Sequence, residues 1–158
     1  MKNSRGITLT SLIIYIIALM IFIGTMATIT KYFYKNFKEI SINDRVTKEY
    51  TELTKFITED TNSKKIENTF ISDKTNEENG TIEGHQIVFK LKDLTTHRYT
   101  FKDNTIYYSE IQDNTAIKNI TLCNNVNTCA FTLNQNILTV SIEFKGGNHY
   151  TTAYTIQK

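Results

Sequence analysis

The chain of 158 residues contains no proline, and it has only two cysteines and six glycines. Proline breaks helices, so its absence leaves room for a long uninterrupted helix. The cysteines form no C-x-x-C pair, the serines form no G-x-S-x-G nucleophile motif, and no glycine-rich loop could cradle a phosphate. Lysine and arginine number 18 against 16 acidic residues, which argues against a nucleic-acid interface that depends on bulk charge. The sequence therefore predicts no catalytic residue, no metal and no cofactor.

Charge is also absent from residues 6–30, which are mostly apolar. A helix that spans a membrane needs roughly 20 such residues. The polar members are threonine, serine, glycine and one tyrosine, which lipid tolerates because hydroxyls bond back to the helix and small residues allow close helix contacts. No other stretch is comparably hydrophobic, so the function must be understood from how this segment enters a bilayer.

A short basic leader precedes the apolar stretch, carries Lys2 and Arg5, and ends at Gly6. This arrangement resembles the prepilin signal of type IV pilins and type II secretion pseudopilins. The resemblance implies that a prepilin peptidase cuts after Gly6 on the cytoplasmic side and that Ile7 becomes the methylated N-terminal residue. Two alternatives stay open, an uncleaved signal anchor and a removed secretory signal peptide, although the apolar core exceeds the ~7–15 residues of a signal peptide.

The signal motif matches that family except at one position. The usual order is Gly, Phe, Thr, Leu, a hydrophobic residue and Glu, of which Gly6, Thr8 and Leu9 match and Ile7 replaces Phe. Ser11 stands where most members have Glu. In the family, that carboxylate neutralises the free amine of a neighbouring subunit, because a charge at membrane depth needs a partner. Serine cannot do so, and the resemblance therefore implies a minor subunit near the filament tip or initiation complex.

Apolar residues continue at helical spacing beyond the charge-free stretch. They recur mostly three or four residues apart, with one longer gap, at Ile29, Phe33, Phe37, Ile40, Val46, Tyr50, Leu53 and Ile57. We predict one helix over about residues 7–60, with residues 7–30 in lipid or in a filament core. Residues 31–60 would lay one apolar stripe on a globular domain. The alternative is two helices with a bend near residues 41–43, where the stripe is weakest.

The charges that flank the apolar stretch leave its orientation ambiguous. Lys2 and Arg5 precede it, but Lys31, Lys35 and Lys38 follow it. The positive-inside rule therefore does not decide which end of the segment lies in the cytoplasm. The prepilin signal and the pair of cysteines place the C-terminal domain on the outer side of the cytoplasmic membrane. The resemblance thus implies a single-pass protein of the cytoplasmic membrane with its N-terminus inside, which later enters an extracellular or cell-surface filament.

The rest of the chain, residues 61–158, is rich in the residue types that favour strands. Strands are predicted at residues 66–71, 87–91, 98–102, 105–110, 117–123, 129–133, 137–144 and 150–156, and residues 73–84 are predicted to be a loop with turns at Asn79-Gly80 and Glu83-Gly84. Asp103-Asn104 is a two-residue hairpin signal. We predict an α+β fold, a long N-terminal helix packed on an antiparallel meander of six or seven strands. The order of these strands is similar to that of J-type minor pseudopilins and W-type minor pilins, which implies a pilin-like fold.

Cysteine and histidine are the remaining candidates for special chemistry. Cys123 and Cys129 flank five residues, and if their two strands pair as a hairpin, the thiols can face each other at disulfide distance. An exported domain favours oxidation, whereas two reduced cysteines and a metal site are the alternatives. His85, His97 and His149 are far apart in the sequence, and we interpret them as surface or strand-end residues.

Aromatic residues gather around the predicted hairpin turn, at Tyr99, Phe101, Tyr107 and Tyr108. They could form an exposed stacking platform for single-stranded DNA, which would suit a DNA-uptake pilus. The favoured interpretation is that they pack a face of the sheet against the long helix.

The sequence as a whole favours a structural protein, a minor pilin or pseudopilin of a type IV pilus, competence pilus or type II secretion-like filament. The implied partners are other pilins or pseudopilins bound through the N-terminal helix, the prepilin peptidase and the cytoplasmic membrane. The competing class is a membrane-anchored binding module that grips DNA, a surface or a secreted substrate without joining a filament. An exported enzyme would need a cluster of polar side chains in a cleft, and the sequence offers none.

Overall fold

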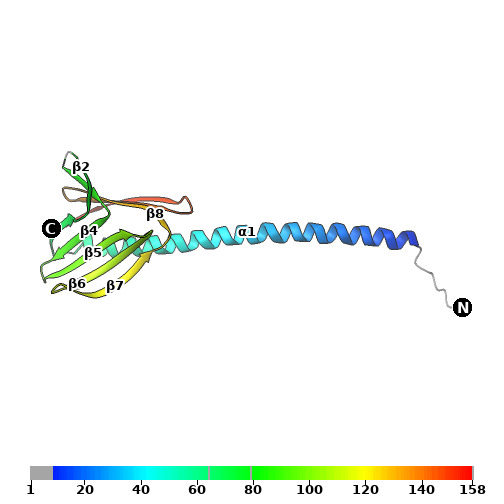
Figure 1. The fold of residues 1–158 in the computed structure, drawn as a ribbon, viewed down its shortest axis with the longest axis horizontal. Coiled ribbons are helices and arrows are strands. Elements are labelled where there is room, and N and C mark those ends of the chain that lie inside the picture. Colours follow the sequence, from blue (N-terminus) through cyan, green and yellow to red (C-terminus); the bar gives the residue numbers. More distant parts are fainter. Residues whose placement is uncertain (1–8, 64, 79, 158) are drawn as a thin grey trace. The chain divides into compact units, whose positions relative to one another are not determined.

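A computed structural model describes residues 9–63, 65–78 and 80–157, and Figure 1 shows its elements. The helix α1 runs over Leu9–Thr61 as one α-helix of 53 residues. The single predicted helix is confirmed, and the alternative of two helices is wrong, because α1 is continuous through residues 41–43. The chain divides into two compact units at Asn43 and Asp44, inside α1 and beside the place where the apolar stripe is weakest.

The second unit contains two antiparallel sheets of five strands each. Across the first sheet the order is β1 (Ile66–Ile71), β4 (Gln86–Leu91), β5 (Thr95–Lys102), β6 (Thr105–Gln112) and β7 (Thr115–Cys123). Across the second sheet the order is β10 (His149–Thr155), β9 (Ile137–Phe144), β8 (Val126–Asn134), β3 (Thr81–Gly84) and β2 (Lys74–Glu78). The fold is α+β, a long N-terminal helix packed against two antiparallel sheets.

The single meander predicted from the sequence is wrong, because the chain changes sheets between β7 and β8. Asn124 and Asn125 form the connection, and Asn125 has a left-handed φ of 56°. The backbone N–H of Val126 donates to the carbonyl of Asn104 at 3.0 Å, and that of Lys145 donates to the carbonyl of Asn125 at 2.8 Å. These bonds tie the connection to a turn of each sheet, so that β8 pairs with β9 and β3 instead of β7.

The predicted loop at residues 73–84 is also wrong, because it contains the paired strands β2 and β3. Their sequences are short and polar, and every residue of β2 is exposed, so no alternation of apolar residues reveals them. β3 is held by its pairing with β8, a contact between segments about fifty residues apart.

The hairpin signal at Asp103-Asn104 is confirmed. Both residues have positive φ, 52° and 59°, as a two-residue turn between β5 and β6 requires. Asp113 and Asn114 repeat this conformation between β6 and β7, with φ of 50° and 62°. Two such turns fix the register of the strands β5, β6 and β7.

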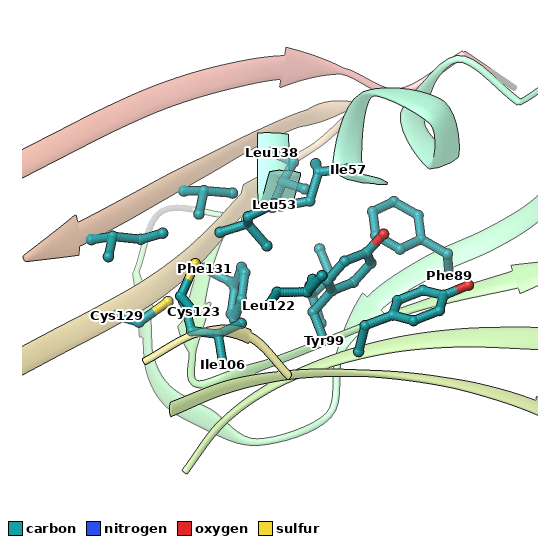
Figure 2. Packing of buried hydrophobic residues seen from close by; sticks show 14 of the residues in the cluster. Leu53, Ile57, Phe89, Tyr99, Ile106, Leu122, Cys123, Cys129, Phe131 and Leu138 are labelled. Carbon is teal, nitrogen blue, oxygen red and sulfur yellow. The ribbon is translucent and has the colours of Figure 1, made fainter. Parts of the chain in front are cut away.

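The core of the second unit lies between the helix and the two sheets. Leu53 and Ile57 of α1 are 1% and 0% exposed, and Figure 2 shows them among side chains from both sheets, such as Tyr99 of β5 and Leu138 of β9. Val46 belongs to the same buried cluster. The expectation that residues 31–60 lay one apolar stripe on the globular domain needs correction, because Phe33, Phe37 and Ile40 of that stripe are exposed.

Candidate functional site

The first unit presents a large apolar surface. Every large hydrophobic side chain that the structure describes between Leu9 and Ile42 is exposed, including Phe22 and Ile23 at the middle of the apolar stretch. This part of α1 is long and apolar enough to span a membrane, and no residue of its most apolar stretch is buried. Soluble monomers rarely expose apolar surface of this extent, and such surfaces mark contacts with membranes or other proteins. The segment therefore indicates membrane association.

The span fits a bilayer in length and in its polar groups. Residues 9–30 contain no charge and rise roughly 33 Å as an α-helix, close to the ~30 Å of the hydrocarbon core. The hydroxyls of Thr25, Thr28 and Thr30 donate to backbone carbonyls one turn earlier, at 2.8, 3.0 and 2.8 Å. Because these three hydroxyls are hydrogen-bonded within the helix, none of them needs a water molecule as a hydrogen-bond partner.

The predicted signal motif is only partly within the described residues. Gly6, Ile7 and Thr8 lie outside them, so the predicted cleavage and methylation sites stay predictions. Leu9 begins α1 and is exposed, and Ser11 lies half-buried in the first turn. No acidic residue precedes Glu39 in the sequence, so the apolar stretch contains no carboxylate.

A polar cluster that sequence reasoning missed lies at the C-terminal end of α1. Asp60 is 7% exposed, and both of its carboxylate oxygens are hydrogen-bonded by side chains of β5. The Nδ1 atom of His97 lies 2.6 Å from Oδ1, and the hydroxyl of Tyr99 donates to Oδ2 at 2.5 Å. Two patterns in the sequence could have indicated this cluster. Asp60 follows the buried Ile57 by one helical turn, and residues 97 and 99 share one face of a strand.

The electrostatics of this cluster follow from burial and from one carboxylate. Burial acts to lower the pKa of His97, but the hydrogen bond and the negative charge of Asp60 outweigh it and raise that pKa above 6.5. Burial, with the same negative charge, raises the pKa of Tyr99 far above its ordinary value. When the imidazole of His97 is protonated, it forms an ion pair with Asp60 that fastens the end of α1 to β5.

The predicted cysteine hairpin is wrong, because β7 and β8 lie in different sheets. The structure has Cys123 and Cys129 as free, buried thiols, and Figure 2 shows both among the buried side chains of the core. Burial raises the pKa of Cys123 to about 12, and burial together with Cys123 raises the pKa of Cys129. Because Cys123 lies in β7 and Cys129 in β8, a disulfide between them would join the two sheets, and it stays a prediction.

Glu49 of α1 fastens the helix near the same corner. Its Oε2 atom accepts from the backbone N–H of Asn124 at 2.8 Å, and its carbonyl accepts from the Cys123 thiol at 3.5 Å. The helix thus contacts the first sheet at both ends of its buried half. It meets the second sheet between them, where Tyr50 stacks on Tyr150 at a centroid distance of 4.3 Å.

The remaining candidates do not converge on one site. His85 and His149 are exposed, and Nδ1 of His85 bonds the carbonyl of Cys129 at 2.8 Å. Within residues 9–63, 65–78 and 80–157, no group of three or more His, Cys, Asp or Glu side chains could hold a metal ion.

The alternative of an exposed aromatic platform is wrong, because most of its rings are covered. Tyr99 and Tyr108 are buried with their rings 5.2 Å apart, and Phe101 is half-buried. Of the four, Tyr107 is the exposed one. Packing between sheet and helix is therefore confirmed for Tyr108, whose ring lies 5.0 Å from that of Phe56 in α1.

No family model, no curated protein and no solved structure matches this chain. Its function must therefore be inferred from its own residues.

Proposed function

We propose that this protein is a minor pilin or pseudopilin, a structural subunit stored in the cytoplasmic membrane and incorporated into a filament through helix–helix contacts. The observation that carries the proposal is the division of one helix into two kinds of surface. Residues 9–43 expose their apolar side chains, whereas Val46, Leu53 and Ile57 are buried in the core of the second unit. The exposed part can exchange lipid for the helices of other subunits while the second unit stays folded.

The order of the elements supports the same proposal. The basic leader and the motif from Gly6 to Leu9 immediately precede the exposed span, at the position where a prepilin peptidase would act. Ser11 and the absence of any acidic residue before Glu39 support a minor subunit, since no carboxylate in the span could pair with a neighbouring amine.

Substitution of Gly6 tests this function. We expect Gly6→Val to leave the precursor uncleaved in the membrane and absent from sheared surface filaments. The matched control, Ser4→Val, changes the same leader outside the motif and should be cleaved and assembled as in wild type. An ordinary membrane anchor would be indifferent to both changes, and equal behaviour of the two variants would contradict the proposal.

A further inference from the structure

A basic and aromatic segment follows the uncharged span at once. Lys31, Lys35 and Lys38 are exposed, and the exposed Tyr32 and Tyr34 lie between the first two of these lysines. We call these five residues the basic girdle. It carries three positive charges, and no acidic residue precedes it anywhere in the sequence.

The three lysines lie on one face of α1. Their spacing of four and then three residues places them within about 60° of one another on an ideal α-helix. Thr28, Tyr32 and Tyr34 lie around them on the surface of the same helix. Among the described residues none of the three lysines forms an ion pair, although Glu39 follows Lys35 by one turn.

The length of the span sets the depth of the girdle. Residues 9–30 rise roughly 33 Å, so a helix whose Leu9 end lies at one face of the bilayer brings Lys31 to the opposite face. Tyrosine rings favour this interface, and lysine side chains extend along apolar surface until their ammonium groups reach the headgroups. The girdle thus lies where phosphate oxygens are the most abundant acceptors.

The positive-inside rule leaves these lysines unexplained. With the N-terminus inside, the girdle lies on the outer side, where basic residues oppose the orientation. Charge complementarity gives them another role. We propose that the basic girdle binds the headgroups of anionic phospholipids in the outer leaflet, so that these lipids hold the stored subunit at a fixed depth. The inference rests on the membrane storage proposed above and adds the lipid partner.

The chain contains no tryptophan, so Tyr34→Trp supplies a single tryptophan inside the girdle, which is excited selectively at a wavelength where tyrosine does not absorb. The full-length variant is reconstituted in phosphatidylcholine vesicles that contain, at equal mole fraction, either brominated phosphatidylglycerol or brominated phosphatidylcholine. Quenching by each lipid gives the relative association of the anionic and zwitterionic headgroups. One lysine near an anionic surface contributes about fivefold to binding, so we expect phosphatidylglycerol to be preferred by about fivefold or more.

The preference should fall to near unity when Lys31→Gln, Lys35→Gln and Lys38→Gln are combined. The matched control combines Lys65→Gln, Lys102→Gln and Lys145→Gln, which removes the same charge from exposed positions of the second unit and should keep the preference.

Equal quenching by the two lipids, or a preference that survives loss of the girdle lysines or disappears in the control, overturns the lipid site while membrane storage stands. Quenching by neither lipid places the segment outside the bilayer and overturns both proposals. Retained lipid preference in the triple girdle variant, together with loss of assembly, would assign the lysines to a protein partner instead.

Discussion

Asp60 attaches the C-terminal end of α1 to β5 of the first sheet. A buried carboxylate is costly unless it is paired and hydrogen-bonded, and here both oxygens have partners on β5. The charges that face His97 come from several elements, with Asp60 on α1, Glu110 on β6 and Asp93 before β5. Because all three are acidic, they favour the protonated imidazole.

We predict that the stability of the protein falls as pH rises above about 6.5. The folded pKa of His97 lies above its unfolded value, so its protonated form contributes stability fully below about pH 6.5, and this contribution is lost as pH rises through the folded pKa. The Asp60→Asn variant removes the charge that raises this pKa. Its deficit in unfolding free energy, about 1–3 kcal/mol at pH 6, should narrow toward pH 9.

Urea denaturation of the full chain in detergent at several pH values measures this deficit. Glu59→Gln serves as the control, because Glu59 is a neighbouring acid that is exposed and pairs only with Lys55 at 4.0 Å among the described residues. It should follow the wild-type pH curve. A deficit of Asp60→Asn that is constant across the range would refute the role of His97.

Among the glycines that the structure describes, Gly84 has the least space around it. A Cβ at this position would lie 1.9 Å from the carbonyl oxygen of Asp73 and 2.5 Å from Cγ2 of Ile71, so a backbone would have to move. We predict that Gly84→Ala destabilises the protein by about 1–3 kcal/mol, the usual cost of overpacking. At Gly146 the nearest atom is 4.0 Å away, and Gly146→Ala should leave the thermal midpoint almost unchanged. Equal thermal midpoints for the two variants would show that Gly84 does not lie this close to Asp73 and Ile71.

At the scale of elements, the two parts of α1 should respond differently to the loss of an apolar side chain. Leu53→Ala removes a side chain that is 1% exposed and should lower the unfolding free energy by about 2–5 kcal/mol. Phe37→Ala removes a larger side chain that is 77% exposed, and it should leave the unfolding free energy unchanged while weakening assembly with other subunits. Denaturant titration and recovery of each variant in sheared filaments measure the two effects. A large loss of stability in Phe37→Ala would contradict this division of the helix.

Elements whose local pattern agrees with their environment could be predicted from the sequence. α1 follows from apolar spacing without proline, and β9 has the predicted bounds because Leu138, Val140, Ile142 and Phe144 alternate strictly and are all buried. The turn at Asp103-Asn104 follows from residues that tolerate positive φ.

The features that depend on distant contacts could not be predicted. β2 and β3 carry no apolar alternation and exist through pairing with each other and with β8. The change of sheet at Asn125 depends on backbone bonds to residues 104 and 145, which no local pattern reveals. The cluster around Asp60 likewise forms only when the end of the helix approaches β5.

At the scale of the whole molecule, each unit suits a different task. The second unit, Asp44–Lys158, buries its apolar residues in one core between a helix and two sheets. The first unit, whose described part is residues 9–43, offers apolar side chains to whatever surrounds it, lipid or neighbouring helices. A protein built this way can change its surroundings without unfolding, as a filament subunit stored in a membrane must do.

The most direct test of this account is the N-terminus of the mature protein. Filaments or membranes from cells that express the full chain and a prepilin peptidase are analysed by intact-mass and peptide mass spectrometry. The account predicts a chain that begins at Ile7 and carries one methyl group on its N-terminal amine. Mature, assembled protein that still begins at Met1 with the leader attached would contradict it.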